Sequence, residues 1–405
     1  MRFNLWEDCN RVPLTELLSF VVDNRGKTVP TAPSGHKLIA TNCVTNNALF
    51  PVYEKIRYLS EETYQTWFRA HPIPGDILFV NKGTPGRVCL VPDPVDFCIA
   101  QDMIALRADE SKIYPKYLFA VLRSREIQQQ IYNTNVGDVI PHFKKQFLDQ
   151  LLIPIPERSI QESIGDLYYV LSLKAERNKK INDNLEQQAR AIFQAWFIDY
   201  EPFGGVAPLA WHPSTLGQIA ELKTDSWSPA KNPDVMVEHY SIPAFDEQHY
   251  PVFEIAAGIK SNKYILNSNS VMISKLNPDT KRIWRPLCLS AHSVCSTEFI
   301  VYEAKKQEQR DYIYSILDST PFLNHLCSHT TGSTNSRQRA TPKSTLDFTL
   351  CLPPDSIIED FCQIVTPMYD LIASNIVENQ SLAKTRDSLL PRLMSGELDV
   401  SSLDI

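Results

Sequence analysis

The sequence lacks the features that mark a nucleotide-binding enzyme, a membrane protein or a secreted protein. Glycine is scarce, with 13 among 405 residues. Neither the GxGxxG nor the GxxxxGKS/T pattern occurs, which argues against a dinucleotide site or a P-loop. No run of about 18 apolar residues is present, and the N-terminal segment has no apolar signal core. We therefore expect a cytoplasmic protein that does not contact a membrane.

Paired cysteines and catalytic motifs are also missing. The nine cysteines form no CxxC pair and mostly lie in apolar stretches, which is typical of reduced, buried thiols. His325, Cys327 and His329 lie close together, but without a second ligand pair a metal site is not expected. The GxSxG, HExxH and adenine-methylation motifs do not occur. We predict a chain with no catalytic centre, metal or cofactor of its own.

Negative charge is concentrated in the last part of the sequence. The formal net charge is −7. Residues 355–405 contain 3 Lys and Arg against 9 Asp and Glu, whereas residues 1–156 contain 17 against 16 and residues 198–354 contain 14 against 16. Any contact with a polyanion must therefore be made by the two long segments 1–156 and 198–354.

The sequence is an internal repeat of one unit of roughly 200 residues. Residues 148–156 align with residues 346–354 at an offset of 198. Beyond this segment the offset is 197, so that Ile164 aligns with Phe361. The repeated unit is near the size of one domain.

Each copy of the repeat contains a globular part followed by a long helical pattern. The globular parts alternate strand-like apolar runs with short helical patterns, which predicts an α+β fold. Connectivity makes the two helices antiparallel, so we expect two similar mixed α/β domains that are joined by these helices and related by a pseudo-two-fold axis. The predicted parts are a first domain (1–156), a central helix (157–197), a second domain (198–354, with a linker at 198–213), and a distal helix with its tail (355–405).

The helical patterns have the spacing of a coiled coil. A helix of about 40 residues is roughly 60 Å long, so we favour pairing of the two helices over the alternative that each covers only its own domain. Asn178 and Asn375 occupy equivalent positions and are expected to fix the register. Pro367 costs about 3 kcal/mol inside a helix, so the second helix is expected to be kinked there or to begin after it. The predicted seam comprises residues 160, 164, 167, 171, 174, 178, 181, 185, 188, 192 and 195, and residues 357, 361, 364, 368, 371, 375, 382 and 389.

Basic and polar residues gather at two equivalent places in each domain. A symmetric pair of domains suits a two-part site on duplex DNA. Lys and Arg neutralise phosphates, whereas Arg, Asn and Gln can read base edges. A few basic residues on one turn are usually only a solvated surface, but their recurrence in both copies favours DNA contact. The candidate DNA-binding residues are Lys82, Thr84, Arg87, His142, Lys144 and Lys145 in the first domain, and Lys275, Asn277, Lys281, Arg282, Arg285, Ser333, Thr334, Arg337 and Arg339 in the second.

Three aromatic residues at the end of the first helix exceed what its seam needs. Phe193, Trp196 and Phe197 either pack on the second domain and its linker or form a docking surface for a partner protein. Leu390 and Leu393 are their counterparts on the distal helix. Both interpretations remain open from the sequence.

Several motifs resemble the specificity subunits of type I restriction–modification systems. Residues 185–202 and 382–397 resemble the ends of that family's central and distal helices, and residues 75–78 and 296–300 are similar to strand motifs of its target recognition domains. The similarity covers essentially the whole chain and preserves the order of its parts.

The resemblance implies that the two domains are target recognition domains. Each would read one half of a split double-stranded DNA sequence, and the helices would set the gap between the halves. It also implies assembly with two methylation (M) subunits and with restriction (R) subunits. S-adenosylmethionine, ATP and Mg²⁺ would be bound by those partner subunits only, because this chain is expected to be non-catalytic.

Two other classes of function compete with this interpretation. The chain could be a two-headed scaffold that binds proteins without reading DNA, or a self-contained DNA-modifying enzyme. Steep weakening of binding with salt would favour DNA over a protein scaffold. Methyl transfer by the purified chain alone would establish an enzyme.

Overall fold

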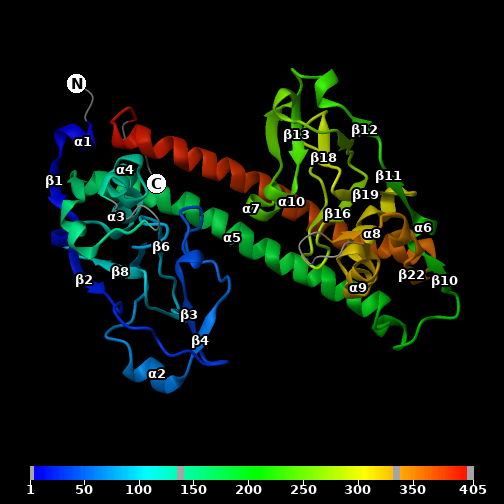
Figure 1. Ribbon diagram of the computed structural model, residues 1–405, viewed down its shortest axis with the longest axis horizontal. Coiled ribbons are helices and arrows are strands. Elements are labelled where there is room, and N and C mark those ends of the chain that lie inside the picture. Colours follow the sequence, from blue (N-terminus) through cyan, green and yellow to red (C-terminus); the bar gives the residue numbers. More distant parts are fainter. Residues whose placement is uncertain (1–3, 135–140, 332–337, 399–405) are drawn as a thin grey trace. The chain divides into compact units, whose positions relative to one another are not determined.

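The computed structural model describes residues 4–134, 141–331 and 338–398 (Figure 1). Short strands alternate with short helices, apart from two helices of 40 residues each, α5 (Arg158–Phe197) and α10 (Asp355–Met394). Within the described range, no helix is both long enough and apolar enough to cross a membrane.

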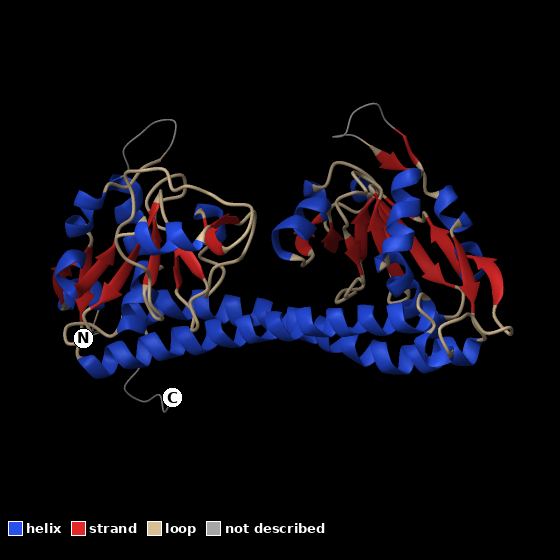
Figure 2. Ribbon diagram, turned by 90° about the horizontal axis from the view of Figure 1, so that it is seen from below, coloured by secondary structure: helices blue, strands red, loops and turns tan. Residues whose placement is uncertain are grey.

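The chain divides into two compact units that share both long helices. The first unit comprises residues 1–178 and 378–405, and the second comprises residues 179–377. Each unit therefore contains one globular part, here called its head, and one half of each long helix. Within each unit the strands of the head lie on one side of the helices (Figure 2).

The first head contains two sheets of more than two strands. One sheet is four-stranded, in the order β2-β8-β5-β6, and the other is three-stranded, in the order β4-β3-β7. A separate antiparallel pair, β1 with β9, precedes α5. The elements are α1 (Leu5–Asp8), β1 (Asn10–Pro13), β2 (Leu18–Val22), β3 (His36–Ile39), β4 (Arg57–Leu59), α2 (Glu61–Thr66), β5 (Ile77–Val80), β6 (Val88–Leu90), β7 (Phe97–Ile99), β8 (Met103–Ala108), α3 (Pro115–Leu122), α4 (Arg125–Thr134) and β9 (Leu152–Ile155).

The second head repeats this plan with additional strands. Its four-stranded sheet has the order β11-β19-β16-β17, and its second sheet is five-stranded, in the order β12-β15-β18-β13-β14. The elements are β10 (His212–Thr215), α6 (Leu216–Ile219), β11 (Ala220–Lys223), β12 (Ser226–Trp227), β13 (Met236–Tyr240), α7 (Ile242–Gln248), β14 (Val252–Ile255), β15 (Lys263–Ile265), β16 (Ser270–Ser274), β17 (Ile283–Trp284), β18 (Ser293–Ser296), β19 (Phe299–Ala304), α8 (Arg310–Asp318), α9 (Thr320–Ser328), β20 (Thr330–Thr331), β21 (Arg339–Ala340) and β22 (Thr349–Leu352).

The strand pairings confirm the internal repeat and the α+β fold. In the first head β3 pairs in parallel with β7 and antiparallel with β4. In the second head β13 pairs in parallel with β18 and antiparallel with β14. The terminal pair β1–β9 corresponds to β10–β22. The second sheet of the second head differs by the additional strands β12 and β15, and this head also contains the pair β20–β21.

The two long helices pair in an antiparallel manner within each unit. In the first unit, Asn178 Nδ2 donates hydrogen bonds to Glu378 Oε2 at 2.6 Å and to Asn379 Oδ1 at 2.9 Å. In the second unit, Asn375 Nδ2 donates to Asn182 Oδ1 at 2.8 Å. Asn178 and Asn375 are both buried, and their bonds favour one register, as their positions in the sequence predicted.

The predicted seam is wrong at several positions. Ile181, Ile364 and Leu371 are 44%, 40% and 47% exposed. The buried stripe instead continues one position further on, for example at Val365 and Ile372. A helix that packs on its head as well as on the other helix buries a face that lies between the two contacts. The helices therefore pair with each other and also cover the heads, so the two interpretations are both correct.

The hydrophobic cores show this double packing directly. In the first unit, Ile164 and Tyr168 of α5 belong to the same buried cluster as Tyr117 and Phe119 of α3. The Phe119 and Tyr168 rings meet edge to face, with centroids 5.9 Å apart. In the second unit, α5 and α10 enter one cluster with the residues of α8.

Helix α10 begins before Pro367, contrary to the alternative that it starts after this residue. It is continuous from Asp355, and Ile358, Phe361 and Val365 are fully buried upstream of the proline. Burial of side chains of this size contributes about 1.5–3 kcal/mol each, which offsets the cost of about 3 kcal/mol for an internal proline.

Helix α5 lies very close to the backbone of the first head at Gly165. A Cβ atom at this position would lie 2.6 Å from Tyr117 N and 2.9 Å from the Lys116 carbonyl carbon, which are backbone atoms. We predict that Gly165→Ala destabilises the chain by about 1–3 kcal/mol through overpacking, although alanine is the better helix former by about 1 kcal/mol. Thermal unfolding of the purified chain measures the change. The control is Gly258→Ala, where the nearest atom is Glu254 Oε2 at 3.7 Å. A stabilising Gly165→Ala would contradict the proposed close packing.

Candidate DNA-recognition surface

In the first head, two separate basic segments lie side by side. The turn segment, residues 81–87, connects β5 to β6, and the adjoining segment, residues 141–145, follows it much later in the sequence. Gly83 N donates to Pro141 O at 3.0 Å, and Phe143 N donates to Asn81 O at 2.7 Å. The Asn81 side chain adds a bond to Phe143 O at 3.1 Å.

The second head joins its equivalent segments in the same way. Here the turn segment is residues 275–282, between β16 and β17, and the adjoining segment is residues 338–342. Asn277 N donates to Gln338 O at 2.9 Å, and Ala340 N donates to Lys275 O at 2.9 Å. Each head therefore brings together the two places at which the sequence predicted DNA contacts. Ser333, Thr334 and Arg337, which were predicted as well, lie outside the described residues.

In the first head the predicted cations reach solvent. Lys82 and Lys144 are exposed, whereas Thr84, Arg87 and His142 are partly buried. Lys145 lies 3.2 Å from Asp23 Oδ2. Among the described carboxylates, neither Lys82 nor Lys144 has an ion-pair partner, so both are available to an anion.

In the second head most of the predicted cations are already paired with carboxylates. Lys275 has no such partner among the described residues, and Asn277 accompanies it on the turn segment with a partly buried side chain. The pairs are Lys281 with Asp318 at 2.5 Å, Arg282 with Asp246 at 2.6 Å, Arg285 with Asp311 at 2.8 Å, and Arg339 with Glu298 at 3.0 Å.

Arg285 is a structural residue, so its prediction as a DNA contact is wrong. Its side chain is 11% exposed and donates to Asp311, which is 2% exposed, and to Asp370 of α10 at 2.6 Å. Burial alone would raise the pKa of Asp311, but hydrogen bonds from Arg285 and Arg310 hold it below its ordinary value. The arginine therefore ties α8 to α10 within the second unit.

The structure also answers the question of the aromatic residues at the end of α5. Phe193 and Phe197 are buried, and both pack against Phe361, with ring centroids 6.0 and 5.0 Å apart. Trp196 packs edge to face on Phe203 of the linker, with ring centroids 6.2 Å apart.

The docking interpretation is wrong for four of these five residues. Phe193 and Phe197 cover the second head's core, and Leu390 and Leu393 are buried in the first unit's core. Side chains held in this way do not form an exposed surface. Trp196, which is partly buried, packs against the linker and so also belongs to the internal contacts.

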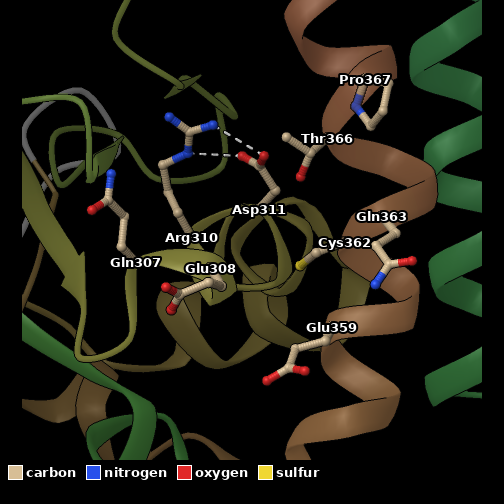
Figure 3. A pocket seen from close by; sticks show the side chains of 9 residues that line it. All are labelled: Gln307, Glu308, Arg310, Asp311, Glu359, Cys362, Gln363, Thr366 and Pro367. Atoms are coloured by element: carbon tan, nitrogen blue, oxygen red, sulfur yellow. Dashed lines mark hydrogen bonds and ion pairs between the residues drawn. The ribbon is translucent and has the colours of Figure 1, made fainter.

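An exposed face of α10 was not recognised from the sequence, because Ile364 and Leu371 had been assigned to the seam. Ile364, Pro367 and Leu371 are exposed there. Pro367 also borders an open hollow of about 750 Å³ between α10 and residues 307–311. Figure 3 shows the Glu308 and Glu359 carboxylates in this hollow on the same side of the Arg310–Asp311 pair. The apolar face therefore adjoins an acidic recess.

The sequence-based prediction of DNA-binding residues also omitted the segment that follows β2. Asp23 accepts hydrogen bonds from Arg25 at 2.8 and 2.9 Å, and its carbonyl oxygen accepts one from Arg69 at 3.0 Å. Its carboxylate is also the one that Lys145 approaches. Hydrogen bonding from Arg25 strongly lowers the pKa of Asp23. The signal in the sequence was a run of charges directly after an apolar strand, which places them at a sheet end.

The histidines that could suggest a metal, His325 and His329, lie side by side with ring centroids 4.3 Å apart, but a third ligand is missing in the described part of the chain. Across the described residues no group of three His, Cys, Asp or Glu side chains is arranged to hold a metal ion. His325 Nε2 lies 2.9 Å from Ser344 O. All nine cysteines are free thiols, and burial raises the pKa of the Cys98 thiol to about 12.

Comparisons with known proteins agree with this architecture. Residues 21–187 match the family model of the type I restriction modification DNA specificity domain. The chain is 24% identical to the type I restriction enzyme MjaIX specificity subunit of Methanocaldococcus jannaschii, over 81% of this chain and 79% of that protein. It is 22% identical to the HindI specificity subunit of Haemophilus influenzae, over 80% and 86%. The crystal structure of a type I system S subunit from M. genitalium has the same fold, with a TM-score of 0.56 and 15% identity over 97% of this chain and 98% of that one.

The repeated heads, the shared helices and these relatives define a DNA-specificity protein. The chain belongs to the family of specificity subunits of type I restriction–modification systems. It is a DNA-recognition subunit and not a catalytic one, as the resemblance in its sequence implied.

We predict that Arg285→Ala destabilises the second unit by about 3 kcal/mol, because Asp311 would remain buried with one partner fewer. Since the pKa of Asp311 is lowered, its stabilising contribution is present above the ordinary carboxyl pKa of about 4 and is lost as the pH falls through the lowered value. Thermal unfolding of wild type and variant at several pH values measures both effects.

The matched control is Arg282→Ala. Arg282 is 13% exposed, much like Arg285, but its partner Asp246 is 46% exposed, so its loss leaves no buried carboxylate and the pair is worth less than about 1 kcal/mol. An Arg285→Ala variant as stable as the Arg282→Ala variant would contradict the structural role of Arg285.

Proposed function

We propose that each head reads one half of a split double-stranded DNA sequence through its turn segment and its adjoining segment. The observation that carries this proposal is the common backbone link: Gly83 to Pro141 in the first head and Asn277 to Gln338 in the second. Equivalent frames with different side chains suit two different half-sequences. Base edges are read by side chains, whereas backbone groups mainly position the protein.

The two long helices would set the gap between the two halves of the recognised sequence. Helix α5 joins the two heads along the chain, α10 leads back from the second unit to the first, and half of each helix is packed into each unit. Their length would therefore be translated into the number of base pairs between the half-sites.

Assembly with two methylation subunits and with restriction subunits completes the proposal. S-adenosylmethionine, ATP and Mg²⁺ would be bound by these partners, and this chain would supply recognition alone. The assembled complex would act on DNA in the cytoplasm. The relatives are named as specificity subunits of type I restriction enzymes, which supports the kind of assembly.

We expect the exposed face of α10 to receive a helix of a methylation subunit. Ile364 and Leu371 lie seven residues apart and therefore on one face of the helix, with Pro367 between them. Their side chains are 40% and 47% exposed. Apolar side chains in an exposed row are suited to a helical partner, and the neighbouring Glu308 and Glu359 would favour basic residues beside that helix.

Insertion of the same number of whole helical turns into α5 and α10 should lengthen the gap and leave both half-sequences unchanged. The variant is co-expressed with the methylation subunits, and the methylated adenines of the host DNA are mapped by sequencing. Wild type mapped in parallel gives the reference gap. A gap that stays constant would contradict the spacing role, and an altered half-sequence would contradict independent reading by the heads.

Replacement of the exposed apolar face, Ile364→Glu with Leu371→Glu, should weaken binding of the methylation subunit by at least about tenfold, which is roughly 1.4 kcal/mol. Co-purification and titration measure the loss. The control is Met236→Glu with Ile255→Glu, which changes two side chains of the second head that are 52% and 53% exposed and cross-strand neighbours. Equal weakening by the two double variants would contradict docking on α10.

A further inference from the structure

The loop end of the four-stranded sheet carries different charge in the two heads. In the first head, Val22 of β2 pairs with Ala105 of β8, and Val80 of β5 pairs with Met103. Strands β2 and β5 therefore finish where β8 begins. The segments that follow or precede these strand ends lie together there, along with the adjoining segment 141–145.

Cations dominate the described part of this end of the first head. Within segments 23–27, 81–87, 100–102 and 141–145, together with Arg69, the acidic residues are Asp23 and Asp102 alone. Asp23 is shared between Arg25 and Lys145, so a single carboxylate serves two cations and leaves excess positive charge. The cations are Arg25, Lys27, Arg69, Lys82, Arg87, Lys144 and Lys145.

Among the residues that the structure describes, the equivalent end of the second head is neutralised. Segments 224–228, 275–282, 296–298 and 338–342 contain four cations, and three of these are held by carboxylates. Two of the carboxylates, Asp246 and Asp318, reach in from α7 and α8. A further two, Asp225 and Asp279, lie on the segments themselves.

From this contrast we infer that the first head makes most of the chain's contacts with DNA phosphates, while the second head contributes little to the salt-dependent affinity. The inference rests on the proposed function, since it assigns the phosphate contacts of the same surface. A cation that must leave a carboxylate before it contacts a phosphate adds little to the free energy of DNA binding, because one ion pair replaces another. An unpaired lysine releases condensed counterions from the DNA instead.

The test compares the salt dependence of duplex binding between matched double variants. Lys82→Ala with Lys144→Ala removes two unpaired cations from the first head. Lys275→Ala with Arg339→Ala removes one residue from each equivalent segment of the second head. The full-length chain, in complex with its methylation subunits, is titrated into a fluorescein-labelled duplex of mixed sequence between about 50 and 200 mM salt.

The slope of log K against log salt should become shallower by about 2 in the first-head variant, since each phosphate contact contributes about 0.9. The second-head variant should change it by less than about 1. Lys82→Arg with Lys144→Arg should restore the wild-type slope, because it retains the charge. Thermal unfolding checks that the variants are folded.

Equal changes of slope in the two variants, or a larger change from the second head, would overturn the inference while duplex binding by wild type leaves the proposed function standing. Failure of the wild-type complex to bind any duplex would overturn the proposed function as well, so the two failures are distinguishable.

Discussion

Each long helix is part of two hydrophobic cores, and the rest of the structure depends on this shared burial. Ile164 and Tyr168 of α5 are buried with the first head, whereas Phe193 and Phe197 are buried with the second. Large side chains of this kind each stabilise the fold by about 1.5–3 kcal/mol. Neither head can slide along the helices without exposing part of its own core. The helices are therefore components of the two folded units and not inert connectors between them.

The sequence allowed the repeat and the long helices to be predicted, because both leave strong periodic signals. The predicted central helix, 157–197, agrees with α5 at Arg158–Phe197. The helix face was less accessible to prediction. Residues 364 and 371 are both apolar and seven residues apart, and so are residues 365 and 372, so either pair fits the apolar pattern of a seam. The two pairs nevertheless point about 100° apart around the helix. Only the position of the head beside the helix decides between them.

Charged side chains were predictable as candidates but not in their roles. The partners of Lys281, Arg282 and Arg285 are Asp318, Asp246 and Asp311, which lie about 26 to 37 residues away in the sequence. A local pattern around one turn contains no information about such partners. In the folded chain these cations form ion pairs with carboxylates that are distant in the sequence.

The backbone link between the turn segment and the adjoining segment explains how one scaffold can serve two different readings. The bonds from Gly83 to Pro141 and from Asn277 to Gln338 join main-chain atoms, so they do not require particular side chains, although the Asn81 side chain strengthens the link in the first head. Side chains on the segments can then change without loss of the frame. This freedom separates two properties that DNA-binding surfaces often combine: attraction to phosphates, which requires unpaired cations, and discrimination between bases, which requires only well-placed polar groups. A head whose cations are neutralised can therefore remain selective while the other supplies most of the attraction.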